Sequence, residues 1–224
     1  MKRGKLFLET MRENGIGEIF LSPPAALSVD KKMEGSDSRE ALLQLRKEVI
    51  QCTRCNELVR SRHSVVFGSG NPKARLVFVG EAPGAEEDRQ GLPFVGAAGQ
   101  LLTKMIDAMG LSREEVFIAN VLKCRPPGNR TPKPAEIENC SPYLVLQLSL
   151  IRPQIICALG TFAAQTLLKT GVPISQLRGR FHDFSGAKVL CTFHPAYLLR
   201  NPGEKRKVWE DMKAIKKELE IGNL

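Results

Sequence analysis

The sequence predicts an α/β fold built on a parallel sheet. Short apolar runs of strand length alternate with helical patterns of about 10 to 15 residues, which is typical of βαβ units. The four runs expected to form the sheet cover residues 75–80, 116–120, 154–159 and 188–193. Three of them deliver a polar side chain at the carboxyl end, namely Glu81, Asn120 and His194. Because the carboxyl ends of parallel strands share one edge of a sheet, we expect these three side chains to line one pocket.

The composition is that of an ordinary globular protein. Of the 224 residues, 25% are charged and 42% are hydrophobic, so the chain can bury a core without cross-links. We expect one domain over residues 39–224. Before it we expect an extension of residues 1–38 that is partly mobile, because glycines, prolines and a linker-like stretch at 31–38 interrupt every pattern there. The net charge of +9 and the pI near 9.4 favour a polyanionic partner.

The sequence contains no sign of a membrane span or a secretion signal. No apolar run reaches the length of about 18 residues that a spanning helix needs. The basic start Met1–Lys5 resembles a signal, but Glu9 ends the apolar stretch that follows it. We therefore expect a cytoplasmic protein whose cysteines are metal ligands or buried thiols rather than disulfides.

The turn that follows the run at 75–80 organises the rest of the chain. Gly80, Pro83 and Gly84 end the strand and force a turn, and three acids follow at 86–88. Open α/β sheets bind ligands at such strand ends. Glycines there let a flat ligand approach the main chain.

The remaining elements follow from periodicity and from breaker residues. Leu42, Leu45 and Val49 recur at helical spacing, whereas Pro142 cannot donate a backbone hydrogen bond and predicts a junction in its helix. In chain order we expect a helix from Ser38 to Cys52, an edge strand at 65–67, a surface loop at 91–96 carrying Phe94, a helix at 97–109 with Gly110 as its cap, a helix after Thr131 that restarts at Pro142, a helix from Thr161, its cap, to Gly171, and a charged helix at 204–219.

Four of the six cysteines are candidate metal ligands. Cys52 and Cys55 form a C-x-x-C pair, and Cys124 and Cys140 follow at a spacing too wide for a simple zinc finger. Four thiolates can hold a zinc ion or a [4Fe–4S] cluster, and four buried core thiols are the alternative. The other two, Cys157 and Cys191, lie in apolar runs and are expected to be ordinary buried residues.

Six motifs in this order resemble the family 4 uracil-DNA glycosylases, which are iron–sulfur enzymes. They are the C-x-x-C pair, GEAPG at 80–84 followed by acids, PFVG at 93–96, NVLKCRPPGNR at 120–130, a further cysteine at 140, and HPA at 194–196. The resemblance covers about residues 40–218. It implies a three-layer α/β/α sandwich on a central four-stranded parallel sheet, and cleavage of the N-glycosidic bond between uracil and deoxyribose in DNA.

The resemblance also implies roles for individual residues. Cys52, Cys55, Cys124 and Cys140 would hold a structural [4Fe–4S] cluster, and Gly80, Glu81, Ala82, Phe94, Asn120 and His194 would form the uracil pocket. Phe94 can stack on a flipped base, Asn120 can pair with uracil O4 and N3–H, and His194 can donate to O2 as negative charge grows. Ala82 stands where the best-known uracil glycosylases carry an aspartate that activates water. The candidates to replace it are Glu81, Glu87, Asp88 and Asn129, with Glu87 and Asn129 preferred.

DNA contacts are expected from basic residues and from the segment after His194. They are Arg125, Arg130 and Lys133, Leu198 or Leu199 as a wedge in the base stack, and Arg200 on phosphate. A buried leucine pair that caps the sheet is the alternative for 198 and 199. We expect a monomer acting on single- or double-stranded DNA. The competing hypotheses are a non-catalytic iron–sulfur protein that binds nucleic acid or carries electrons, and a zinc-stabilised hydrolase acting on another damaged base.

Overall fold

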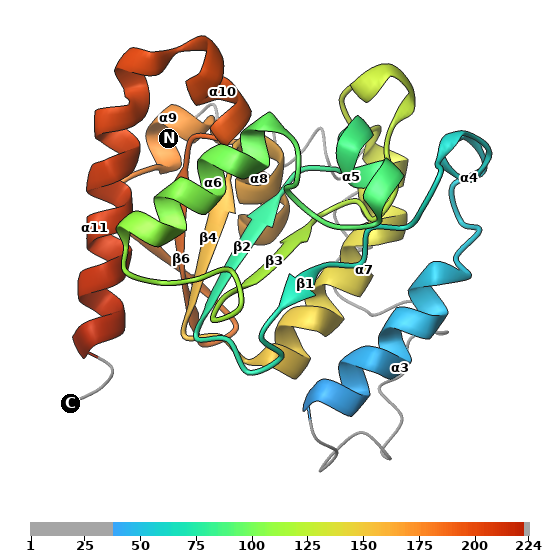
Figure 1. Ribbon diagram of the computed structural model, residues 1–224, viewed down its shortest axis with the longest axis horizontal. Helices are drawn as coiled ribbons and strands as arrows, with labels where there is room; N and C mark the ends of the chain where they lie inside the picture. The colour runs from blue at the N-terminus through green and yellow to red at the C-terminus, as the bar shows by residue number, and fades with distance from the viewer. Residues whose placement is uncertain (1–37, 222–224) are drawn as a thin grey trace, which may run out of the picture. The chain divides into compact units, whose positions relative to one another are not determined.

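The computed structural model describes residues 38–221 (Figure 1). The expected extension therefore lies outside the described residues, apart from Ser38, which begins the first described helix. Among the described helices, none combines the length and the apolar character that crossing a membrane requires.

The described sheet has six strands in the order β1-β3-β2-β4-β6-β5. Its four central strands are parallel and agree with the sequence prediction: β3 (Phe117–Asn120), β2 (Leu76–Gly80), β4 (Ile155–Leu159) and β6 (Ala187–Thr192). The expected central four-stranded parallel sheet is therefore present, within a larger described sheet. One short antiparallel strand is added at each edge, β1 (Ser69–Gly70) beside β3 and β5 (Phe181–Phe184) beside β6.

The two edge strands relate differently to the sequence prediction. The β5–β6 hairpin turns at Ser185 and Gly186, whose φ angles of 49° and 86° are those of a tight hairpin turn. The edge strand expected at 65–67 was misplaced. Val66 instead donates its N–H to the Lys123 carbonyl at 2.8 Å, outside the regular ladder, and pairing with β3 begins only at Ser69.

Helices cover both faces of the sheet, which confirms the three-layer arrangement (Figure 1). On one face, α6 (Ala97–Ala108) and α11 (Lys205–Ile221) share a core with β2, formed by side chains such as Phe78, Leu102 and Met212. On the other face, α8 (Thr161–Leu168) packs against β2 and β4, and α7 (Pro134–Ile151) packs against α3 (Ser38–Ile50). Burial from both sides explains why β2, β3 and β4 are buried along their whole length.

Short helices follow the strands and shape the pocket edge. They are α4 (Asn56–Ser61), α5 (Ala85–Gln90), α9 (Ile174–Leu177), α10 (Pro195–Arg200) and the 3₁₀ turns η2 (Pro127–Asn129) and η3 (Pro202–Glu204). Of these, α5 follows β2, η2 follows β3 and α10 follows β6.

Helices α7 and α8 differ from the prediction. Helix α7 runs unbroken through Pro142, so the expected junction was wrong. A proline removes only its own bond to the carbonyl four residues earlier, and its neighbours Ser141 and Tyr143 are buried, so tertiary packing holds the helix together. Helix α8 is preceded by Gly160 as its cap, with φ of 86°, and ends at Leu168 instead of Gly171.

A buried polar network fixes the carboxyl end of β6. The Thr192 hydroxyl donates to the Asp211 carboxylate of α11 at 2.5 Å, and Arg178 donates to the same carboxylate at 2.8 and 2.9 Å. The Arg178 guanidinium also lies 5.3 Å from the centre of the Phe193 ring. Asp211 and Arg178 therefore fix the positions of Thr192 and Phe193, the two residues that directly precede His194.

Candidate functional site

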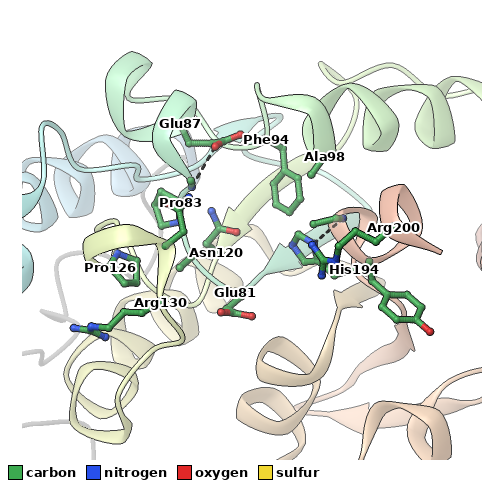
Figure 2. Close-up of a pocket in the computed structure, with 15 residues that line it drawn as sticks. Glu81, Pro83, Glu87, Phe94, Ala98, Asn120, Pro126, Arg130, His194 and Arg200 are labelled. Carbon is green, nitrogen blue, oxygen red and sulfur yellow. Dashed lines mark hydrogen bonds between the residues drawn. The ribbon is translucent and has the colours of Figure 1, made fainter. Parts of the chain in front are cut away.

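A pocket of about 430 Å³ opens at the carboxyl edge of the sheet (Figure 2). The structure brings Glu81, Ala82, Phe94, Asn120 and His194 together in its lining, although they come from four separate parts of the chain. Glu87, Asn129, Arg130 and Arg200 also line it. The three polar residues expected at strand ends thus meet in one place.

Gly80 leaves room for the pocket floor. A Cβ atom added there would lie 2.4 Å from Asn120 Oδ1 and 2.6 Å from Phe94 Cζ, closer than real Cβ contacts come. Gly99 of α6 permits a similar approach, because a Cβ there would overlap the Phe94 carbonyl at 1.9 Å. The ring of Phe94 therefore lies close to Gly80 of the strand, while its main chain lies close to Gly99 of the helix.

The Phe94 loop is also tied down through its main chain. Arg113 donates to the Phe94 carbonyl at 3.1 Å and to the Pro93 carbonyl at 2.8 Å. Phe94 has a φ of 53°, in the left-handed region that bulky residues rarely adopt. These bonds help hold the aromatic ring in place over the pocket.

Asn120 presents an unpaired acceptor at the pocket. The residue is 2% exposed, and its Oδ1 has no hydrogen-bond partner among the described residues. A buried polar atom left unpaired costs about 1–3 kcal/mol, and such atoms in native proteins call for a functional explanation. The orphan oxygen marks the place where a ligand donor would bind.

His194 lies across the pocket with a defined tautomer. Its Nδ1 accepts the Ala196 N–H at 3.1 Å, so in the neutral ring the proton is on Nε2. Burial, aided by the nearby Arg200 cation, lowers the pKa of His194 to about 4. Its ring stacks at 5.5 Å on that of Phe94. The side chain is therefore a neutral imidazole with one N–H to donate.

The acidic residues at the pocket have different environments. Glu87 accepts three backbone N–H groups, from Gly84 at 3.1 Å and from Val95 and Gly96 at 2.8 Å, and so joins the turn to the Phe94 loop (Figure 2). Glu81 has no side-chain hydrogen bond or ion pair within the described residues, and burial raises its pKa. Asp88 is buried away from the pocket, where its carboxylate accepts the N–H groups of His63 and Ser64.

Most of the basic residues expected to contact DNA already have partners. Arg130 forms ion pairs with Glu136 at 2.6 Å and Glu57 at 3.2 Å, and Lys133 pairs with Glu57. Arg125 donates to Asn129 Oδ1 at 2.7 Å. This bond occupies the amide oxygen of Asn129, a side chain that was expected to orient water. These contacts fix the loop after β3 against α4 and α7.

The two leucines of α10 differ in exposure. Leu198 is 1% exposed and belongs to the core beneath α10, whereas Leu199 is 47% exposed. Leu198 therefore cannot enter a base stack without leaving the core, and the expectation that it serves as a wedge is corrected. Leu199 remains available, next to the exposed Arg200.

The four candidate ligand cysteines lie near one another. All are free thiols. Cys55 interacts electrostatically with Cys52 and Cys124, and Cys140 does so with Cys55 and Cys124. Cys157 and Cys191 are fully buried in β4 and β6, as expected.

The environment of the four sulfurs suits a bound metal cluster. Arg62 donates to Cys124 Sγ at 3.1 Å, Asn139 to Cys55 Sγ at 3.7 Å, and the Lys123 N–H to Cys140 Sγ at 3.2 Å. Burial raises the pKa of Cys140 to about 12, so thiolates here require a compensating positive charge. Within residues 38–221, no group of three or more His, Cys, Asp or Glu side chains is placed to hold a single metal ion.

Sequence reasoning missed Lys123. The residue is 1% exposed, and its ammonium donates to the Asn120 carbonyl at 2.8 Å and to the Gln147 side-chain oxygen. Burial lowers its pKa to about 8. A lysine in a basic loop looks like a surface residue, and only its position between Asn120 and Cys124 could have drawn attention to it.

We expect Gly80→Ala to destabilise the protein by about 1–3 kcal/mol, because the added methyl group must displace Asn120 or Phe94 from a packed site. Urea denaturation measures this change. Gly203→Ala is the matched control, since a Cβ there meets no atom within 4 Å. Equal stability of the two variants would show that the pocket floor yields to the methyl group.

Comparisons with known proteins place the chain among DNA repair enzymes. The sequence pattern of the uracil DNA glycosylase superfamily matches residues 67–213. The chain is 45% identical over 184 residues to a type-4 uracil-DNA glycosylase of Archaeoglobus fulgidus, covering 79% of this chain and 92% of that protein. It is 47% identical over 184 residues to one of Thermotoga maritima, covering 80% and 95%. A type-5 uracil-DNA glycosylase of Pyrobaculum aerophilum is 32% identical over 187 residues, covering 69% and 82%.

Proposed function

The chain belongs to the uracil DNA glycosylase superfamily, and we propose that it excises uracil from DNA by hydrolysing the N-glycosidic bond, leaving an abasic site. The observation that carries this proposal is the unpaired Asn120 oxygen, which faces one pocket together with the Phe94 ring and the neutral His194. These are a hydrogen-bonding reader, a stacking surface and a donor for developing negative charge.

Recognition of the base rests on Asn120. Flipping a base out of the duplex costs about a few kcal/mol, and stacking on Phe94 recovers about 1–3 kcal/mol without selecting uracil. Uracil N3–H supplies the donor that Asn120 Oδ1 lacks, while the Asn120 amide N–H donates to O4. Cytosine presents an acceptor at N3, so it would leave two acceptors facing each other in a buried site.

Bond cleavage places negative charge on the departing uracil and positive charge on the sugar. The Nε2–H of His194 donates to uracil O2 and stabilises that charge as it develops. Glu81 orients the attacking water, because Glu87 already accepts three N–H groups and Asn129 is bonded to Arg125. The water oxygen bonds to the sugar carbon, its proton passes to the Glu81 carboxylate, and uracil leaves as the anion.

DNA lies across the mouth of the pocket. Leu199 fills the gap left by the flipped base, and Arg200 meets phosphate beside it. The protein acts as a monomer on uracil in single- or double-stranded DNA.

Cys52, Cys55, Cys124 and Cys140, which are free thiols in the structure, are the residues that would hold a [4Fe–4S] cluster. When bound, the cluster supplies a cross-link between distant segments rather than redox chemistry in the reaction. Those segments are the chain around α4, the loop after β3, and α7. The three N–H donors to sulfur help to stabilise the thiolate charge.

Incubation with uracil-containing oligonucleotides followed by alkali tests the function directly. We expect strand breaks at uracil opposite guanine, opposite adenine and unpaired, and none in matched oligonucleotides with cytosine or thymine at that position. Intact uracil DNA after incubation with iron-loaded protein would reject the enzyme in favour of a non-catalytic iron–sulfur protein.

The pH profile of the single-turnover rate tests the role of His194. Because the pKa of His194 is lowered to about 4, the ring stays neutral above about pH 5. No inflection is then expected near 6.5, the usual histidine value. Protonation below pH 4 breaks the bond from the Ala196 N–H.

His194→Ala should lose about 10²–10³-fold in rate with little change in DNA affinity. Parallel losses of rate and affinity would make His194 a simple contact.

Metal analysis of cysteine variants tests the cluster. Wild-type protein should contain about four iron atoms and matching acid-labile sulfide per chain, with visible absorbance. Cys124→Ala should lose the iron and melt at a lower temperature. Cys157→Ala, at a fully buried cysteine away from the four, should keep its iron. A colourless wild-type protein that contains zinc would overturn the assignment.

A further inference from the structure

The ammonium of Lys123 lies in the interior between the pocket and the cysteines. Its Nζ donates to the Asn120 carbonyl at 2.8 Å and to Gln147 Oε1. Gln147 Nε2 in turn donates to the Phe67 carbonyl at 2.9 Å. The chain after β3, helix α7 and the segment before β1 are thus joined at one buried cation.

The main chain of Lys123 is held as firmly as its side chain. Its carbonyl accepts the Val66 N–H at 2.8 Å, and its own N–H donates to Cys140 Sγ at 3.2 Å. The loop from 120 to 124 therefore connects the pocket at one end to two of the four cysteines at the other.

Asn120 needs such external support. Its Oδ1 has no partner, so the side chain cannot be fixed by its own hydrogen bonds in the absence of substrate. Steric contact with Gly80 and Phe94 limits where the carboxamide can go. The polar contact nearest to it along the chain is the bond from Lys123 to the carbonyl of the same residue.

We propose that Lys123 is a positioning residue for base recognition, which holds the backbone of Asn120 so that the carboxamide is oriented toward uracil before the base binds. The bond from Lys123 N–H to Cys140 ties this support to the cysteine site. Lys123 touches no part of the base, since it does not line the pocket. Its effect reaches uracil only through Asn120.

A purely structural role makes a different prediction. A buried ion replaced by an apolar side chain of similar length can leave stability unchanged or raised, so stability does not distinguish the two. Affinity for the base does, because uracil contacts Asn120 whereas an abasic strand does not. Replacing a positioning residue lowers the affinity for uracil and leaves the affinity for abasic DNA nearly unchanged.

The test compares Lys123→Met with wild type in two binding measurements. One is the inhibition constant of free uracil, and the other is the affinity for an abasic oligonucleotide. We expect uracil to bind about tenfold more weakly or worse, abasic DNA to bind within about threefold of wild type, and the single-turnover rate to fall by about 10²-fold, as for a misplaced group. Iron content and melting temperature are recorded for each protein.

Lys188→Met is the matched control. Lys188 of β6 forms a surface ion pair with Glu218 of α11, so this variant should leave all values unchanged. Gln147→Leu removes one acceptor of the ammonium and keeps the bond to Asn120 available. It should weaken uracil binding in the same direction by a smaller factor. If Lys123→Met does not retain its iron or does not fold, the test rests on Gln147→Leu. Weaker binding of uracil with unchanged binding of abasic DNA then supports the inference, and unchanged binding of both overturns it.

Wild-type affinity for uracil in the folded variant would overturn the inference, as would equal losses for uracil and abasic DNA. The inference rests on the proposed function, but the two fail differently. If wild-type protein leaves uracil DNA intact, the function itself fails, whereas an active wild type with a variant unchanged in uracil affinity removes only the role of Lys123.

Discussion

The unpaired Oδ1 of Asn120 is the constraint on which the site depends. A buried acceptor without a donor is unfavourable by about 1–3 kcal/mol, and it persists only if its surroundings prevent it from turning toward another partner. Gly80 and Phe94 lie close to it, and its backbone is held both by strand pairing with β2 and by the bond from Lys123 to its carbonyl. The fold therefore favours a ligand that offers a hydrogen-bond donor to this oxygen.

The fold class and the convergence of the site were predictable, because both follow from local pattern. Apolar runs located the four parallel strands, and parallel strands place Glu81, Asn120 and His194 on one edge. The hairpin strand β5 was missed although Ser185 and Gly186 form a turn signal. The unbroken path of α7 through Pro142 was not predictable, because tertiary packing holds it.

Side-chain roles were less predictable, because they depend on partners that are distant in sequence. Glu87 and Asn129 look like free polar groups in the sequence, but the structure shows three backbone donors on one and Arg125 on the other. Leu198 and Leu199 are identical in type, and only the packing of α10 separates the buried one from the exposed one. For Lys123 the only signal in the sequence is its position between Asn120 and Cys124, since burial of a lysine is a property of the assembled fold.

The two sides of the pocket are supported by separate networks. Asn120 is held from the side of α7, through Lys123, Gln147 and the cysteines. His194 is held from the side of α11, where Asp211 accepts from Thr192 and Arg178, and Arg178 covers Phe193. The ring of Phe94 stacks on His194 and lies against the Gly80–Asn120 floor, so it is the contact at which the two sides meet. If Asn120 selects the base and His194 stabilises the leaving group, as proposed, the two roles would rest on different parts of the core, and damage to one support need not displace the other residue. Under the proposed function both supports would be needed for efficient cleavage, because stacking on Phe94 alone distinguishes neither uracil from cytosine nor ground state from transition state.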